Sequence, residues 1–278
     1  MCKGAEMKNK IAGKVVFITG ASSGIGLALA NKLTSLGAIV YGVARSKCQE
    51  KGFVCYECDV NDSDKMEQIL KEVFEKEGKL DVFVNNAGYG IAGAICTTQT
   101  KSIYDLVDTN LSAVINLSAK AIPYLKQSKD GRIINISSIG GIVPLPYQAV
   151  YSATKAGVDI FSRALANEVK PFGIKVSVVM PGDIKTGFTA NRKIEGGKAD
   201  DEYSKSVAMS IKKVEKDEQT GKGPEGVVKV ICKAITKKNP PLKVSVGFWY
   251  KCVTPLVRFL PTRMVNWIVE KLYCKKAK

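Results

Sequence analysis

The chain has 278 residues, of which 45% are hydrophobic and 24% are charged. This composition is typical of a globular protein with a substantial core and argues against a disordered or fibrous chain. Because the chain contains no histidine, a histidine general base, a Ser-His-Asp triad and every histidine-ligated metal site are excluded.

The formal net charge of +16 is unevenly distributed. Residues 204–278 carry 17 Lys and Arg side chains against 5 Asp and Glu. Such a segment fits either a solvated face or contact with an anionic partner such as a membrane surface. The sequence leaves both alternatives open, and we predict no nucleic-acid partner.

The eight cysteines follow an N-terminal segment that lacks the apolar region of a secretory signal. We therefore expect a cytoplasmic protein with reduced, structural cysteines. Cys55 and Cys58 form a C-x-x-C pair, but no second pair completes a zinc site, so we predict no metal. No apolar run is long enough to span a bilayer.

Seven short apolar runs predict β-strands, and most are apolar on successive residues, as in a parallel sheet covered on both faces. In chain order they are residues 15–19, 39–44, 53–58, 81–86, 132–137, 175–180 and 243–247. Helical patterns lie between them at residues 25–36, 63–76, 104–125 and 149–169. This alternation predicts an α/β fold with a doubly wound, mostly parallel, seven-stranded Rossmann-type sheet.

No repeat or linker divides the chain. We predict one domain over residues 1–250, with a flexible polar substrate lid near 187–223. Residues 251–278 follow as a basic, amphipathic C-terminal helical extension packed on that domain. The helix predicted from Thr262 has an apolar face flanked by basic side chains. That face comprises Met264, Val265, Trp267, Ile268, Val269 and Leu272, and its basic flank comprises Arg263, Lys271, Lys275 and Lys276.

A glycine-rich turn, TGASSGIG (19–26), follows the first strand and opens the first long helix. Gly20, Gly24 and Gly26 lack the side chains that would keep a pyrophosphate from the backbone N–H groups and the helix dipole. A strand, turn and helix in this order favour a dinucleotide site over an ordinary turn.

The second strand ends at Arg45, where NAD-binding proteins of this fold place a carboxylate for the ribose hydroxyls. A guanidinium there can form a bidentate pair with a 2′-phosphate, which favours NADP(H). The alternative is a surface arginine at a strand end.

Tyr151 and Lys155 lie four residues apart near the start of a predicted helix, so they project from one face. A neighbouring ammonium favours the phenolate, and we expect Lys155 to lower the pKa of Tyr151. Ser138 and residues 85–88 follow strands, where active-site residues of open α/β sheets gather.

Together these motifs, with Asn110 and Pro181-Gly182, resemble the short-chain dehydrogenase/reductase family over residues 12–250. The resemblance implies that Tyr151 is the acid/base, Lys155 binds the ribose, Ser138 polarises the substrate oxygen and Asn110 supports a proton relay. Ser137 competes for the serine role, but the family's spacing selects Ser138.

The resemblance also implies which residues contact the cofactor. We expect these to be Gly20, Ser22, Ser23, Gly24, Ile25, Gly26, Arg45, Asp59, Val60, Asn86, Ala87, Gly88, Tyr151, Lys155, Pro181, Gly182, Ile184 and Thr186. Asp59 and Asn86 also fit as cap or turn residues.

We therefore expect an NADP(H)-dependent oxidoreductase that acts on a lipophilic alcohol or ketone. Its substrate would be a steroid-like compound, a retinoid or a lipid ketone. The apolar residues 139–150 favour such a substrate, and the long tail resembles the hydroxysteroid and retinol dehydrogenase branch. Two alternatives stay open: a ketoacyl-thioester reductase of fatty-acid synthesis and a non-catalytic NADPH-binding sensor. We further expect a homodimer or homotetramer through the helices at 104–125 and 149–169, with peripheral membrane contact through the tail.

Overall fold

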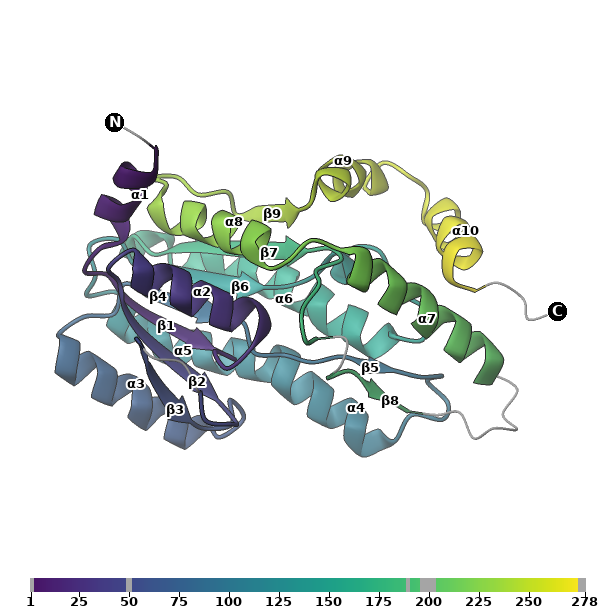
Figure 1. The fold of residues 1–278 in the computed structure, drawn as a ribbon, viewed down its shortest axis with the longest axis horizontal. Helices are drawn as coiled ribbons and strands as arrows, with labels where there is room; N and C mark the ends of the chain where they lie inside the picture. The colour runs from purple at the N-terminus through teal and green to yellow at the C-terminus, as the bar shows by residue number, and fades with distance from the viewer. Residues whose placement is uncertain (1–2, 49–51, 189–190, 196–203, 275–278) are drawn as a thin grey trace.

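The computed structural model describes residues 3–48, 52–188, 191–195 and 204–274. One parallel sheet of seven strands runs through its centre, and each predicted strand is confirmed within two residues of its expected bounds (Figure 1). The strands are β1 (Val15–Thr19), β2 (Ile39–Ala44), β3 (Val54–Glu57), β4 (Val82–Asn85), β6 (Arg132–Ile136), β7 (Lys175–Pro181) and β9 (Lys243–Val246).

The strand order is β3-β2-β1-β4-β6-β7-β9, and every pairing is parallel. The order reverses between β1 and β4, where the connections leave in opposite directions. A crevice at the carboxyl ends of these strands is where a doubly wound sheet binds its ligand.

Helices cover both faces of the sheet. One face carries α2 (Gly24–Ser35), α8 (Glu225–Thr236) and α1 (Lys3–Ile11), with Leu29 and Ile231 fully buried between them and the strands. The other carries α3 (Ser63–Glu77), α5 (Ala113–Leu125) and α6 (Ala149–Glu168). Local chemistry sets the ends of α3: Asp62 accepts from the Lys65 N–H, and Gly78 takes the left-handed conformation after the last turn.

The helix expected over 104–125 is interrupted. It consists of α4 (Thr100–Val107), a π-helical turn η1 (Asp108–Ser112) and α5. Asn110 lies in the π-turn, and the wider turn changes the direction of its side chain relative to a regular helix. The apolar periodicity continues through this segment, so it does not reveal the extra residue.

The segment expected as a flexible lid contains a 17-residue helix, α7 (Ser204–Thr220), which the sequence analysis did not predict. Val207, Ile211 and Val214 supply a helical apolar spacing that the surrounding lysines obscure. Before α7, the short strand β8 (Lys193–Ile194) pairs with β5 (Ile91–Ala92). Gly196 and Gly197 lie outside the described residues.

After β9 the chain forms α9 (Phe248–Val257) and α10 (Thr262–Tyr273). The helix predicted from Thr262 is confirmed, whereas α9 was not anticipated. Both helices lie at the sheet edge beyond β9, and α10 contacts α7 (Figure 1). Lys275 and Lys276, expected on the rim of this tail, lie outside the described residues.

Cysteine pairing differs from expectation, because Cys48 and Cys55 form a disulfide rather than remaining reduced. Cys58, the other member of the C-x-x-C pair, is free and buried. Within the described residues no three Cys, Asp or Glu side chains gather in a way that could hold a metal ion. The helices among these residues are also too short or too polar to cross a membrane.

Candidate active site and cofactor cleft

The glycine-rich turn fits a pyrophosphate. A Cβ on Gly26 would lie 2.1 Å from the Gly20 carbonyl oxygen, so only glycine allows this close packing. Gly20 and Gly24 adopt positive φ angles of 69° and 55°. Ser23, the N-cap of α2, makes no side-chain capping bond, so the first N–H groups of α2 face the cleft with the positive end of the helix dipole.

Asn86 connects this turn to β4. Its side-chain amide donates to the carbonyl oxygens of Thr19 and Gly20, at 2.9 and 3.1 Å. The Thr19 hydroxyl in turn accepts from the backbone N–H groups of Asn86 and Ala87. Asn86 therefore holds the turn in place, which is a structural role beside its expected contact with the cofactor.

The residues expected at the adenosine end of the cofactor follow β2 and β3. Arg45 is exposed, consistent with a side chain free to meet a phosphate. Asp59 accepts from the Asn61 N–H at 2.9 Å, so its carboxylate closes a turn. Val60, next to it, is buried.

The loop after β7 closes the other side of the cleft. Thr186 approaches Gly24, since a Cβ there would lie 3.6 Å from the Thr186 Cβ. Gly182 lies against the Tyr250 ring of α9, where any Cβ would overlap the ring. The Tyr250 hydroxyl donates to the Asp183 carboxylate. The C-terminal extension therefore reaches the segment expected to hold the nicotinamide, a contact that the sequence did not predict.

Tyr151 and Ser138 come together from different elements, α6 and the end of β6. A Cβ at Gly140 would lie 3.4 Å from the Ser138 hydroxyl and 3.5 Å from the Tyr151 ring, so the two side chains flank the same small space. Ser137 is buried and donates to the Lys155 carbonyl oxygen at 2.7 Å. Ser138, and not Ser137, faces Tyr151.

Asn110 is fully buried and binds the loop after β4 through both ends of its amide. Its oxygen accepts from the Tyr89 N–H at 3.0 Å, and its nitrogen donates to the Tyr89 carbonyl at 2.9 Å. At Gly88, a Cβ would meet the Asn110 oxygen at 2.9 Å and the Lys155 ammonium nitrogen at 3.4 Å. Asn110, Gly88 and Lys155 therefore adjoin.

Lys155 is buried beneath Tyr151. Its ammonium donates to the Ile136 carbonyl at 3.1 Å and lies 5.8 Å from the centre of the Tyr151 ring. Burial lowers the pKa of Lys155 to about 8, because removal from water disfavours the charged form.

The expected downward shift of the Tyr151 pKa is not found. Burial raises the Tyr151 pKa, and it outweighs a hydrogen bond with Ser138, which lowers it. Glu218 raises this pKa further and Arg192 lowers it through their charges. Tyr151 is therefore protonated at neutral pH and can act as an acid.

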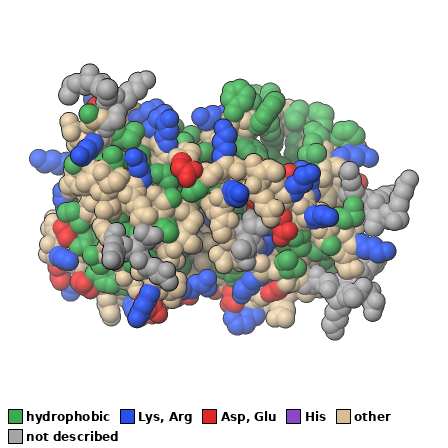
Figure 2. Space-filling model, viewed as in Figure 1, with side chains coloured by type: hydrophobic (Ala, Val, Ile, Leu, Met, Phe, Trp, Pro, Cys, Tyr) green, Lys and Arg blue, Asp and Glu red, His purple; other side chains and the backbone are tan. Residues whose placement is uncertain are grey.

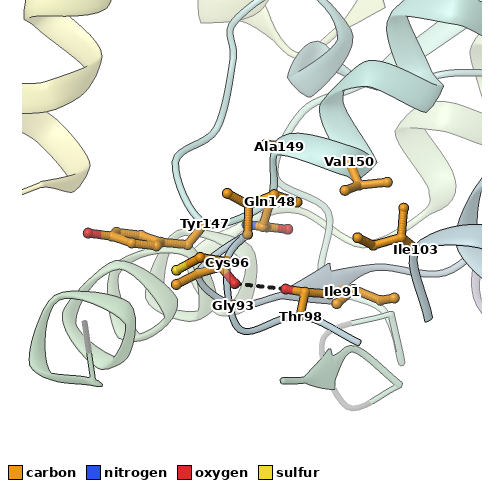
Figure 3. A pocket seen from close by; sticks show the side chains of 11 residues that line it. Ile91, Gly93, Cys96, Thr98, Ile103, Tyr147, Gln148, Ala149 and Val150 are labelled. Carbon is orange, nitrogen blue, oxygen red and sulfur yellow. Dashed lines mark hydrogen bonds between the residues drawn. The ribbon is translucent and has the colours of Figure 1, made fainter. Parts of the chain in front are cut away.

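A cavity of about 270 Å³ lies between the loop after β5 and the start of α6 (Figure 3). Ile91 and Val150 belong both to its wall and to the apolar cluster around Tyr151. In Figure 3, Tyr147 extends from the end opposite Val150 and Ile103. The lining is Ile91, Gly93, Ala94, Ile95, Cys96, Thr98, Ile103, Tyr147, Gln148, Ala149 and Val150.

Two charged residues near the site were not predicted from the sequence. Arg192, at the start of β8, is 7% exposed, and its ion-pair partner Glu218 comes from α7. Between Arg192 and Tyr151 lies Phe188, whose ring centre is 5.7 Å from that of Tyr151. No sequence motif indicates these residues, because they meet only through a tertiary contact between α7 and the segment before β8.

The family model described as short chain dehydrogenase matches residues 14–195. The chain belongs to the short-chain dehydrogenase/reductase family. It is therefore an oxidoreductase of a family that uses a nicotinamide cofactor, and the predicted fold class is confirmed.

Relatives and neighbours of this dehydrogenase/reductase span most of its length. It is 40% identical over 261 residues to a 3-ketodihydrosphingosine reductase of Bacteroides thetaiotaomicron, covering 93% of this chain and 94% of that protein. It is 37% identical to a 3-oxoacyl-acyl-carrier-protein reductase of Haemophilus influenzae, over 64% of this chain and 76% of that protein. A short-chain dehydrogenase structure from Streptomyces avermitilis superimposes with a TM-score of 0.79 at 28% identity, covering 92% of this chain and 96% of that one.

The lowered pKa of Lys155 predicts how NADPH binding depends on pH. The ammonium is present below pH 8 and is lost as pH rises through about 8. If the charged form binds the cofactor ribose, the Kd for NADPH should rise about tenfold between pH 7 and pH 9. Fluorescence titration of the wild-type chain measures this, and Lys155→Met should bind weakly without the step. The same step in both proteins would assign the titration to another group.

Proposed function

We propose that this dehydrogenase/reductase uses NADPH to reduce the ketone of a long-chain lipid to a secondary alcohol, with a 3-ketodihydrosphingosine as substrate. That compound is a 2-amino-1-hydroxy-3-ketone with a long hydrocarbon chain. The observation that carries the substrate class is the apolar cavity, which shares Ile91 and Val150 with the cluster around Tyr151. A hydrocarbon chain can enter this cavity while the ketone stays beside Tyr151.

In the mechanism, bound NADPH supplies the hydride for the carbonyl carbon. Ser138 donates a hydrogen bond to the ketone oxygen and orients it beside Tyr151. The Tyr151 hydroxyl delivers the proton, for which its raised pKa keeps it protonated. Lys155 holds the ribose. Asn110 positions the loop after β4 through its two hydrogen bonds with the Tyr89 backbone and supports the proton relay.

The similarity to the Bacteroides protein supports this substrate over a ketoacyl thioester, because it extends over 93% of the chain, against 64% for the Haemophilus protein. The proposal therefore names a lipid ketone rather than a steroid or retinoid. A non-catalytic sensor would bind NADPH without turnover and would therefore fail the following test.

Replacement of Tyr151 tests the proposed reaction. Wild-type chain should oxidise NADPH when 3-ketodihydrosphingosine in mixed micelles is added, followed by absorbance at 340 nm. Tyr151→Phe should lose at least about a thousandfold in kcat because the proton donor is gone, and should still bind NADPH. Tyr104→Phe, an exposed tyrosine on α4, serves as the control. A rate in Tyr151→Phe within tenfold of wild type would remove Tyr151 from this role.

We further propose that Arg45 selects NADPH. The support is its exposure at the end of β2, beside the glycine-rich turn, where the Gly20 N–H donates to the Val43 carbonyl. Arg45→Asp should lower the ratio of kcat/KM for NADPH over NADH about 100-fold, since it removes a bidentate partner and adds repulsion. Lys71→Asp, an equal change of charge on α3, should leave the ratio unchanged. A parent enzyme that prefers NADH would contradict the proposal.

We propose that the C-terminal extension makes peripheral contact with an anionic membrane, from which a lipid substrate would come. Figure 2 shows hydrophobic side chains gathered over α9 and α10 beside basic ones. Phe248, Trp249 and Phe259 are 77%, 75% and 85% exposed, which a water-facing helix does not require. Lys251, Arg258 and Arg263 supply positive charge.

A vesicle assay tests this contact. The chain should sediment with phosphatidylglycerol vesicles at low salt. It should be released at about 0.5 M salt, because salt screens the attraction between the basic side chains and the anionic lipid. Replacement of Phe248, Trp249 and Phe259 by Ser should abolish most of the binding, whereas Phe172→Ser, an exposed aromatic elsewhere, should not. Absence of wild-type binding at low salt would dispose of the membrane contact.

We also propose a homodimer or homotetramer through the outer faces of α4, α5 and α6. Tyr104, Ile115 and Ile160 are exposed on these helices in the single chain, and Ala153 and Gly157 allow close helix approach. Light scattering that shows only monomer at micromolar concentration would contradict this assembly.

A further inference from the structure

Arg192 lies between the lid and the catalytic residues. The N–H of the next residue, Lys193, donates to the Gly90 carbonyl at 3.0 Å, which anchors the start of β8 beside the loop that Asn110 holds. The guanidinium carbon is 5.8 Å from the centre of the Phe188 ring, and that ring packs on Tyr151. A Cβ at Gly90 would lie only 3.6 Å from the Arg192 Nε. The guanidinium is therefore one aromatic ring away from the proposed proton donor.

The Arg192 guanidinium is buried, but only some of its N–H groups have a hydrogen-bond acceptor. Its Nη2 donates to the Glu218 carboxylate. Nε and Nη1 are buried and have no hydrogen-bond partner among the residues that the structure describes. Burying polar N–H groups without acceptors is costly, and such groups are rare in folded proteins. Nε lies against Gly90, whereas Nη1 lies on a different edge of the guanidinium and can donate to an oxygen atom that a ligand brings.

The ion pair between Arg192 and Glu218 limits which chemical group can supply this oxygen. Because Glu218 already pairs with Arg192, the guanidinium has a counter-ion and does not require an anionic ligand. A neutral acceptor is sufficient, and the nearby carboxylate lets the site tolerate a cationic substrate. These properties match a hydroxyl on an amine-bearing molecule better than a carboxylate or phosphate.

We propose that Arg192 is a specificity-determining residue that donates from Nη1 to the C1 hydroxyl oxygen of the 2-amino-1-hydroxy-3-ketone. This inference rests on the proposed function, because it places the polar end of that substrate. Ser138 and Tyr151 hold the ketone oxygen, Arg192 holds the hydroxyl two carbons away, and the hydrocarbon chain extends into the apolar cavity. Ketones without this hydroxyl leave the Nη1 donor buried and unpaired and are rejected.

The test compares two substrates that differ in one oxygen atom: 3-ketodihydrosphingosine and its 1-deoxy analogue. Wild-type enzyme should favour the hydroxylated ketone by about 10- to 100-fold in kcat/KM, as for a hydrogen bond to a charged group. Arg192→Lys keeps a cation for Glu218 but loses the Nη1 donor, and should reduce this selectivity at least fivefold. Lys213→Gln, which removes the Asp217 ion pair on the same helix, should keep it. Melting temperature and NADPH affinity establish that each variant is folded.

Equal kcat/KM for both ketones in wild type would overturn the inference. So would an equal loss with both substrates in Arg192→Lys, which would make Arg192 a positioning residue for the lid. A selective loss of NADPH affinity in that variant would assign the guanidinium to the cofactor and also overturn it. If wild type reduces neither ketone, the proposed function itself fails, and this outcome is distinct from the others.

Discussion

Two hydrogen bonds between the Asn110 amide and the backbone of Tyr89 fix the geometry on which the site depends. They are buried, so breaking them would leave polar groups unpaired in the core. The π-helical turn exists where Asn110 must face this loop, and an ordinary helix would direct its side chain elsewhere. The loop they hold carries Gly88, which adjoins Lys155, and Gly90, which receives the lid.

The other parts of the site depend on these two hydrogen bonds. The loop positions β5, and β8 pairs with β5, so the segment before α7 has a defined place beside the sheet. α7 then packs Val207 and Ile211 on Ala92 and Ala94. Phe188, from the segment before β8, packs on Tyr151, which is buried. Burial then favours the neutral form of Tyr151 and weakens the charged form of Lys155, which suits a proton donor for ketone reduction.

Local patterns were sufficient to predict all seven strands, the glycine-rich turn and the pairing of Tyr151 with Lys155 on one helix. These features depend on residue spacing within a single element. The missed features are tertiary: Arg192 meets Glu218 across the lid, and Tyr250 reaches Gly182 from the far end of the chain. The direction of the Tyr151 pKa shift was also mispredicted, because a neighbouring lysine can be read from spacing but the depth of burial cannot. The roles of the catalytic residues stay predictions.

The central claim is that this chain transfers a hydride from NADPH to the C3 carbonyl of a long-chain amino ketone. The most direct measurement uses NADPH carrying deuterium at both C4 positions and mass spectrometry of the isolated product. The account predicts one deuterium at C3 of the alcohol formed by the wild-type chain. Alcohol without deuterium at C3, or no alcohol at all from this ketone under conditions where NADPH is bound, would contradict it.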